Sequence, residues 1–258
     1  YYISPQIWAS REGRISKIKR DIDNMYVILP FEKDFYEKKH GYPVQFVGHP
    51  LIDAIENTPL QDNETFRKEN DLEPVKPIIA LLPGSRKQEV QKMLEIMLSV
   101  KKDFPDYQFV IAGAPSLPDE FYAPFLKGDK VEYVSNKTYT LLKHSHAALV
   151  TSGTATLETA LFEVPQVVCY KGNWISYQIA KRIITLDYIS LVNLIMKREV
   201  VKELIQNDLT TANLKNELSK IAKGSERERM LSDYALLKEK LGGKGASEMA
   251  ARLIVKNV

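Results

Sequence analysis

Short, predominantly apolar runs separated by helical patterns constrain the fold of this chain more than any other feature. Between residues 78 and 170 there are four such runs, "IIALL", "YQFVIAG", "AALV" and "PQVVCY", and the stretches between them carry patterns typical of helices. Strands that are apolar on both faces are typical of parallel sheets covered by helices on both sides. The sequence therefore predicts an α/β protein built on doubly wound parallel sheets.

The first 52 residues carry a shorter series of the same kind. The runs "YYIS", "MYVILPF" and "VQFVGHP" predict strands, and "GRISKIKRDI" and "EKDFYEKKHG" predict helices, the first with Ile15, Ile18 and Ile22 on one face. About three strands make half of a doubly wound domain, and the chain starts in a β-type run without Met. We therefore expect a piece of a longer protein, with its first domain incomplete.

A polar stretch with Pro and Asn, residues 56–77, separates the two series and predicts a linker with a short helix. Further along we expect a helix over 174–184, a strand or loop over 187–195, and a helical tail from residue 213 that is broken at "GGKG" (242–245). This pattern divides the chain into an incomplete first domain (1–52), a second domain (53–225) and C-terminal helices (226–258).

Charge and composition exclude several classes of partner. The net charge of +3 is too small to indicate nucleic acid, although it is compatible with an anionic membrane surface or an anionic substrate. No stretch approaches the roughly 20 apolar residues that cross a bilayer. The single cysteine, Cys169, lies in an apolar run, so we expect a buried core residue and a reducing compartment.

A turn of small residues follows the run "AALV" and leads into a helix. In the segment "TSGTATLE" the turn consists of Ser152, Gly153, Thr154 and Ala155, and Glu158 comes one helical turn later. The first turn of a helix favours an anion, and Gly153 lets a phosphate approach the backbone closely. A plain cap by Ser152 or Thr154 is the alternative. Glu158 is out of register for a capping box, and its carboxylate suits sugar hydroxyls.

The segment "LLPGSRKQEV" is a second junction between a strand and a helix. It places Gly84, Ser85 and Arg86 at the carboxyl end of the strand, where ligands bind in open α/β sheets. An Arg near a helix N-terminus is unfavourable without an anion nearby. Arg86 is therefore a candidate to meet a diphosphate as negative charge grows on it; the alternative is an ordinary Pro-Gly turn beside a solvated Arg86.

The chain resembles the lipid-A-disaccharide synthase family in five blocks, which are "YYISPQIWASREGRISKI", "ILPFEKDFYEKKHGYPVQFVGHPLIDAI", "IIALLPGSRKQEV", "TSGTATLETALFEVPQVVCYK" and "SLVNLIMKREVVKELIQ". The resemblance implies a GT-B fold of two Rossmann-like domains and an inverting glycosyltransferase without metal or cofactor. The implied reaction joins UDP-2,3-diacylglucosamine to 2,3-diacylglucosamine 1-phosphate by a β-1,6 linkage and releases UDP. The family's first segment, with its proposed catalytic Asp and its membrane-facing patch, has no counterpart here.

The resemblance also implies a location and partners. It places the protein in the cytoplasm, peripheral on the inner face of a Gram-negative inner membrane, where it would meet anionic lipid. It implies a homodimer that exchanges C-terminal elements, so helices 226–258 either pack back toward the first domain or cross to a second copy, with "GGKG" as a hinge. Nucleic acid is not among the expected partners.

At the matching positions the resemblance assigns roles in the donor site. Residues 152–155 would hold the diphosphate and Glu158 the ribose hydroxyls, with Tyr170 and Lys171 near the base. The last block carries two further candidates for the donor site, Asn193 and Glu199, although this chain has Val192 where the family usually has Pro. A plain strand-end Asn is the alternative at position 193.

His49, in "VGHPLID", is a second catalytic candidate beside Arg86. The Pro that follows restricts it to extended conformations, so we predict either a side chain that faces substrate or a structural hinge. The family's base lies in the segment without a counterpart here. Two other histidines, His144 and His146 in "KHSH", lack carboxylate or Cys partners and do not predict a metal site.

The segment "SPQIWASREGR" contains Ser4, Trp8 and the start of a basic face formed by Arg11, Arg14 and Lys17. At i, i+3 spacing these cations share one side of the predicted helix. A solvated charge run is the usual meaning of such a face. The other interpretation is a contact with the acceptor phosphate or with anionic headgroups.

Two other functions remain open at this point. A UDP-N-acetylglucosamine 2-epimerase would share the fold and the nucleotide site, and the chain would otherwise be a UDP-binding fragment without turnover. For a chain that begins at Tyr1 we expect "YYIS" to be an unpaired edge. Self-association would then follow through the exposed side chains Tyr1, Tyr2, Ile3 and Trp8.

Overall fold

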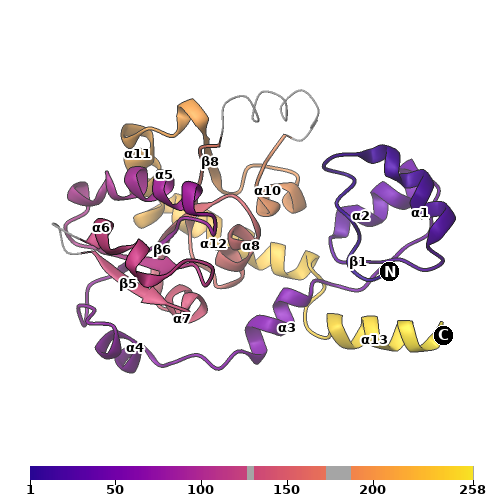
Figure 1. Cartoon of the computed structure of the whole chain (residues 1–258), viewed down its shortest axis with the longest axis horizontal. Helices are drawn as coiled ribbons and strands as arrows, with labels where there is room; N and C mark the ends of the chain where they lie inside the picture. Colours follow the sequence, from indigo (N-terminus) through magenta and orange to yellow (C-terminus); the bar gives the residue numbers. More distant parts are fainter. Residues whose placement is uncertain (127–130, 173–186, 258) are drawn as a thin grey trace. The chain divides into compact units, whose positions relative to one another are not determined.

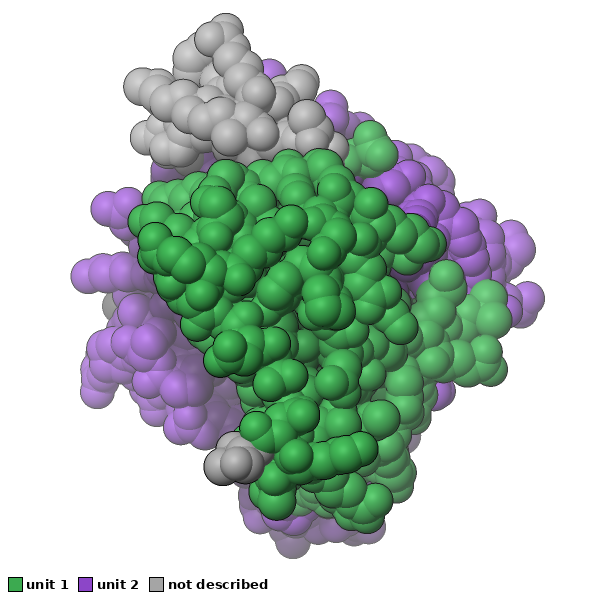
Figure 2. Space-filling view, turned by 90° about the vertical axis from the view of Figure 1, so that its right-hand side faces the viewer, with its two compact units in different colours: residues 1–58, 175–187, 235–258 green, residues 59–174, 188–234 purple. Residues whose placement is uncertain are grey.

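The computed structural model describes residues 1–126, 131–172 and 187–257. The chain forms two compact units, coloured separately in Figure 2. The boundary after Thr58 falls in the polar stretch that predicts a linker. The first unit comprises Tyr1–Thr58, Ala235–Val258 and Ile175–Asp187, most of the last range lying outside the described residues; the second comprises Pro59–Trp174 and Tyr188–Tyr234.

The second unit is built on a parallel sheet of six strands with the order β5-β4-β3-β6-β7-β8. This order, which reverses between β3 and β6, is that of a doubly wound α/β fold, as the sequence predicts. The strands are β3 (Ile78–Leu82), β4 (Gln108–Gly113), β5 (Glu132–Ser135), β6 (Ser145–Thr151), β7 (Gln166–Tyr170) and β8 (Lys202–Ile205).

Helices cover both faces of this sheet. α5 (Lys87–Leu98) and α11 (Thr211–Ala222) lie on one side and α7 (Thr138–Lys143) and α8 (Thr154–Leu161) on the other (Figure 1). All residues of β3 and β4 are buried, which explains why these strands are apolar on both faces. Cys169 in β7 is also fully buried, as predicted. The core beneath α7 and α8 includes Phe66, Ile78, Ala80, Val110, Leu141, Leu142, Ala148 and Val150.

The remaining elements of the second unit are short, except for α12, which contributes residues to both units. The predicted linker helix is present as α4. The predicted helix over 174–184 lies outside the described residues. These elements are α4 (Asn63–Glu69), α6 (Ala123–Leu126), α10 (Leu191–Met196), α12 (Ser225–Lys240) and the 3₁₀ turns Lys101–Asp103, Asp119–Phe121 and Gln206–Asp208.

The first unit has a small parallel sheet of β1 (Tyr26–Val27) and β2 (Gln45–Phe46). The predicted strand "YYIS" is wrong: only Tyr2 forms a bridge, to Tyr26, because Ile3 is left-handed (φ 64°) and ends the extended run. A 3₁₀ turn (Glu12–Arg14) leads into the first helix of this unit, α1 (Ile15–Asp21). The other helices are α2 (Pro30–Asp34), a π-helix (Phe35–Lys39), α3 (Pro50–Asn57) and α13 (Ala246–Lys256). The predicted apolar face of α1 is confirmed, since Ile15, Ile18 and Ile22 pack in one core.

A buried carboxylate organises the start of the first unit. Glu32 is 1% exposed and accepts hydrogen bonds from Ser4 Oγ (2.6 Å), from Trp8 Nε1 (3.0 Å) and from the backbone N–H of Leu29 (3.0 Å). Trp8 also packs edge-on against Phe31, with ring centroids 4.8 Å apart. The expectation of an exposed Trp8 is therefore wrong. The indole nitrogen serves a buried acid, which satisfies both groups.

Two further expectations differ from the structure. The segment 187–195 holds α10 rather than a strand or loop, because Ser190 Oγ caps the helix by accepting from the N–H of Asn193. Arg11 does not share a helix face with Arg14 and Lys17, since Arg11 is left-handed (φ 60°) and precedes the 3₁₀ turn. The helical tail and its break at "GGKG" are confirmed by α11, α12 and α13.

Candidate functional site

A pocket of about 260 Å³ lies in the second unit at the carboxyl ends of β3, β4 and β6. Its position matches the usual ligand site of an open α/β sheet, beside the point where the strand order reverses. Both predicted turns line it, the first with Gly84 and Ser85 and the second with residues 152–155, and Glu158 lines it too. The structure thus brings together two segments separated by about 70 positions of sequence.

The N-terminus of α8 opens into this pocket. Gly153 is the N-cap residue, with φ 153° and ψ −162°, a conformation that is essentially restricted to glycine. The Thr156 hydroxyl and the Thr156 N–H both bond to the Gly153 carbonyl, at 2.8 Å and 3.2 Å. Thr154 and Ala155 follow directly as the first helical residues and line the pocket. Helix N–H groups without a side-chain cap favour an anion at this point.

Ser152 lines the pocket, but its hydroxyl is bonded to the backbone of another segment. Its Oγ donates to the carbonyl of Ile189 at 3.1 Å, and its backbone N–H donates to the carbonyl of Cys169 at 3.3 Å. These bonds attach the turn to β7 and to the segment before α10. The Ser152 side chain is therefore not a cap for α8.

Glu158 projects from the second turn of α8, and its carboxylate has a partner. The hydroxyl of Tyr139 in α7 donates to Glu158 Oε1 at 3.0 Å. Burial, followed by the negative charge of Glu158, raises the pKa of Tyr139 above its usual value of 10.0. The tyrosine is therefore a neutral donor to one oxygen of this carboxylate.

Arg86 is next to the pocket but does not line it. It is the N-cap residue of α5, its side chain is 82% exposed, and its Nη1 lies 3.2 Å from Oε1 of Glu89. Glu89 itself lines the pocket. The Arg86 cation thus offsets the charge of a carboxylate that lines the pocket.

Asn193 does not line the pocket. It is fully buried, and its Nδ2 donates to the Val201 carbonyl and to Glu203 Oε1, both at 2.9 Å. Its Oδ1 accepts from the N–H groups of Val200 (2.7 Å) and Val201 (3.0 Å). These four bonds use the whole capacity of an amide. The side chain therefore clamps the connection from α10 to β8.

The other predicted donor residues lie outside the lining of this pocket. Tyr170 ends β7 and is half-buried, with its hydroxyl above Gly172. Lys171 is exposed. Glu199 is exposed on the turn after α10 and pairs with Lys202 at 3.2 Å. Their contact with a nucleotide base or sugar stays a prediction.

His49 belongs to the first unit, where it caps α3. Its Nδ1 accepts from the N–H of Leu51 at 3.2 Å, and burial lowers its pKa from 6.5 to about 4. A neutral imidazole whose Nδ1 accepts carries its proton on Nε2. In this arrangement Nε2 is a donor, so His49 is poorly suited to act as a general base.

The two histidines of "KHSH" serve separate carbonyl groups. His144 Nε2 lies 2.9 Å from the carbonyl oxygen of Gln61, and His146 Nε2 lies 2.7 Å from that of Ala222. Over residues 1–126, 131–172 and 187–257, no group of three or more His, Cys, Asp or Glu is arranged to hold a metal ion. Within the same ranges no helix is long and apolar enough to cross a membrane.

The pocket also includes residues that sequence reasoning missed. Glu89, Thr138 and Thr151 line it, as do residues 113–115, where β4 ends. The small residues "AGAP" (112–115) at the end of this apolar strand are a local signal for a turn. The Ser116 hydroxyl donates to the Ser85 carbonyl at 2.8 Å, which joins this segment to the first predicted turn.

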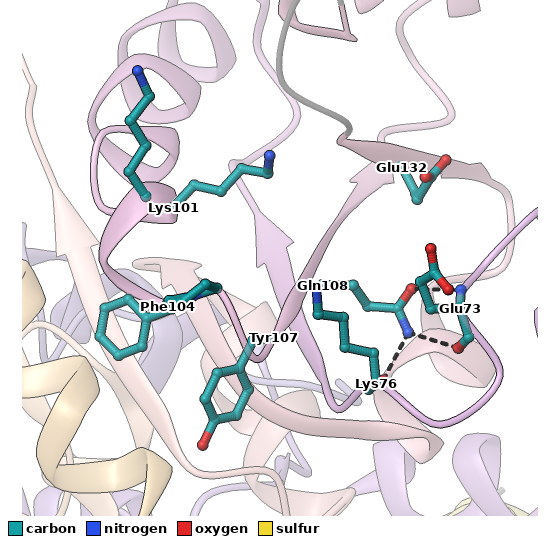
Figure 3. Close-up of a pocket in the computed structure, with 9 residues that line it drawn as sticks. Glu73, Lys76, Lys101, Phe104, Tyr107, Gln108 and Glu132 are labelled. Atoms are coloured by element: carbon teal, nitrogen blue, oxygen red, sulfur yellow. Dashed lines mark hydrogen bonds between the residues drawn. The ribbon is translucent and has the colours of Figure 1, made fainter.

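A second pocket, of about 270 Å³, lies at the amino ends of β3 and β4, opposite the carboxyl ends that form the first pocket (Figure 3). Its lining is of mixed charge, with Lys76 and Lys101 as well as Glu73 and Glu132. Gln108 Nε2 donates to the carbonyls of Glu73 (3.1 Å) and Lys76 (2.7 Å), which fixes the loop between them. The predicted site residues do not line this pocket, and ligands of open α/β sheets bind at the carboxyl ends of the strands.

Comparisons with known proteins identify the family of the chain. A family model described as lipid-A-disaccharide synthetase matches residues 1–257. The lipid-A-disaccharide synthase of Geobacter sulfurreducens is 38% identical over 99% of this chain, and the match spans 67% of that protein. The family prediction is thereby confirmed.

Solved structures with the same fold include enzymes of two kinds. A UDP-GlcNAc 2-epimerase from Neisseria meningitidis bound to UDP-GlcNAc has a TM-score of 0.60 at 16% identity, over 90% of this chain and 61% of that one. The wall teichoic acid polymerase TagF has a TM-score of 0.57 at 15% identity, over 98% and 61%. These likenesses bear out the Rossmann-like fold of GT-B type. At such identities they do not favour an epimerase.

Proposed function

The chain belongs to the lipid-A-disaccharide synthase family, a family of glycosyltransferases, and from that membership we propose its reaction. This protein transfers 2,3-diacylglucosamine from its UDP derivative to 2,3-diacylglucosamine 1-phosphate. The products are UDP and a β-1,6-linked disaccharide 1-phosphate. The main structural support is the pocket at the carboxyl ends of β3, β4 and β6, where α8 presents its N-terminus and Glu158 lies one turn further in.

The donor diphosphate occupies the N-terminus of α8 in this proposal. The backbone N–H groups after Gly153 meet the phosphate oxygens, and the glycine permits the close approach. Negative charge grows on the departing UDP during transfer, so fixed donors at this point stabilise the transition state. Arg86 adds a mobile cation when it turns from Glu89 toward the diphosphate. Neither a metal nor a cofactor takes part.

The acceptor 6-hydroxyl attacks the anomeric carbon in line and inverts its configuration. A base has to take the proton from that hydroxyl. His49 is not this base in the proposal, because its Nδ1 already accepts the N–H of Leu51. His49 Nε2–H suits a different task, which is to donate a hydrogen bond to an oxygen of the substrate.

The location and partners follow from the same proposal. The protein acts as a homodimer in the cytoplasm, on the inner face of a Gram-negative inner membrane, and takes acylated sugars from it. Exposed cations at Arg14 and Lys17 support contact with anionic lipid. Exposed apolar side chains on α13, Met249 (50%) and Val255 (78%), support contact with a second copy or with lipid.

Calorimetry with UDP, UMP and uridine tests the nucleotide site. We expect UDP to bind most tightly and uridine most weakly, because only the phosphates reach α8. Equal binding of UDP and uridine would contradict the proposal.

The reaction itself is tested on the protein at the full length of its relatives, with acylated donor and acceptor. UDP release that depends on the acceptor supports transfer, whereas UDP-N-acetylmannosamine formed from UDP-N-acetylglucosamine would support the epimerase.

A further inference from the structure

Tyr139 and Glu158 form a hydrogen-bonded pair at the edge of the pocket. The tyrosine is in α7 and the glutamate in α8, and the hydroxyl donates to Oε1 at 3.0 Å. Glu158 lines the pocket, whereas Tyr139 does not. The tyrosine therefore contacts the carboxylate from behind, and would not touch a ligand.

The Tyr139 ring is itself held in place. It packs against the ring of Phe162 with centroids 5.2 Å apart, and Phe162 packs on the buried core beneath α7 and α8. Thr138, the residue before Tyr139, lines the pocket beside Glu158. A glutamate side chain that has no partner distributes among several rotamers in water. The fixed Tyr139 hydroxyl therefore restricts Glu158 to the rotamer in which its Oε1 accepts this hydrogen bond.

We propose that Tyr139 is a positioning residue that directs Oε2 of Glu158 at the sugar hydroxyls of the nucleotide, and so makes the site select ribose over deoxyribose. This inference rests on the proposed function, in which the pocket binds UDP. Two neighbouring hydroxyls can both donate to one carboxylate, and a sugar without the 2′-hydroxyl leaves that acceptor partly unpaired. A site built to accept a hydroxyl discriminates strongly against the analogue that lacks it.

The chemistry of the pair is suited to this role. Burial and the adjacent carboxylate both oppose ionisation of Tyr139 and raise its pKa. Its hydroxyl therefore donates to the Glu158 carboxyl group, which accepts. A hydrogen bond to a charged group is also stronger than one between neutral groups.

The test compares UDP with 2′-deoxy-UDP in calorimetric titrations of the full chain and its Tyr139→Phe variant. The variant keeps the ring on Phe162 and removes only the hydroxyl. We expect UDP affinity to fall by roughly tenfold and 2′-deoxy-UDP affinity to change by less than about twofold, so the preference for ribose collapses. Retained binding of 2′-deoxy-UDP shows that the pocket is still folded.

Two further variants separate the possible failures. Tyr42→Phe removes a hydroxyl that donates to the Ile22 carbonyl at 2.6 Å in the first unit, and it should leave the ribose preference unchanged. Glu158→Gln should reduce UDP binding at least as much as Tyr139→Phe. Equal losses for the two nucleotides in Tyr139→Phe, or no loss, would overturn the positioning role alone. If Glu158→Gln also has no effect, Glu158 does not contact the sugar, whereas the nucleotide site itself would be refuted only by equal binding of UDP and uridine.

Discussion

Asp53 Oδ1 accepts a hydrogen bond from the backbone N–H of Gly245 at 2.7 Å, although 192 positions separate the two residues. Oδ2 of the same carboxylate accepts from the N–H of Ser247 at 2.9 Å. Asp53 thus joins α3 to the first turn of α13, where helix N–H groups need an acceptor. These bonds, led by that from Ser247, hold the pKa of Asp53 below its usual value.

Asp53→Asn should loosen α13 without changing the nucleotide site. An amide has one oxygen, so one of the two backbone bonds is lost and the other is no longer charge-assisted. We expect the free energy of unfolding to fall by about 1 kcal/mol, measured by denaturant titration and circular dichroism. The matched control is Glu56→Gln, which removes an ion pair with the exposed Lys244 and should cost less than about 0.5 kcal/mol. Equal effects of the two variants would contradict the role of Asp53.

Glu158→Gln should weaken UDP binding by about tenfold, because a neutral amide replaces a charged acceptor of nearly the same shape. The control is Glu163→Gln, an exposed glutamate just beyond the end of α8 that does not line the pocket. Calorimetry should show unchanged UDP affinity in the control. If both variants bind UDP like the unmodified chain, Glu158 does not contact the ligand.

Arg86→Ala should weaken UDP far more than uridine. The substitution removes a cation and also leaves Glu89, which lines the pocket, to repel the diphosphate. We expect a loss of about tenfold or more for UDP and less than about twofold for uridine. Glu89→Gln in the same chain should restore part of the UDP affinity, which a double-mutant cycle measures.

A neighbouring cation gives the control for this experiment. Lys87 is also exposed at the start of α5, and its Nζ lies 5.9 Å from the ring centroid of Phe121 rather than at the pocket. Lys87→Ala should leave the ratio of UDP to uridine affinity unchanged. Equal losses for both ligands in Arg86→Ala would mean that Arg86 acts through folding.

The buried strands of the second unit could be predicted because a parallel strand in the middle of a sheet has only apolar neighbours. β3 and β4 are fully buried, and their sequences consist almost entirely of apolar residues. β8 was missed because it is an edge strand of four residues with only Leu204 fully buried. α10 was mistaken for a strand or loop because six residues are too few to show helical periodicity, and a cap at Ser190 decides the outcome.

The two turns of the candidate site could also be predicted, since a glycine and small polar residues directly after a buried strand are a local signal. The partners of those turns could not. Tyr139 meets Glu158, 19 positions along the chain, only because α7 and α8 pack on one face of the sheet. Asn193 shows the converse, since its place in a block of family resemblance suggested a ligand contact, and its side chain is instead a buried clamp of the backbone.

The last prediction concerns pH and His49. Burial lowers the pKa of His49 from 6.5 to about 4. Above pH 6.5 the imidazole is neutral in the folded and the unfolded chain, and its contribution to stability is constant. Between pH 6.5 and 4 the unfolded chain binds a proton that the folded chain does not. Protonation then favours unfolding, so stability falls as the pH is lowered through this window, with a slope of up to about 1.4 kcal/mol per pH unit.

His49→Asn isolates this contribution. The Asn oxygen can still cap α3 by accepting the N–H of Leu51, but the side chain no longer titrates. Carboxylates such as Asp53 titrate in both proteins and cancel in the difference. We expect the two proteins to differ by a constant amount above pH 6.5, and the variant to lose less stability between pH 6.5 and 4, as measured by denaturant titration at each pH. Parallel curves through that window would show that burial does not lower the pKa of His49.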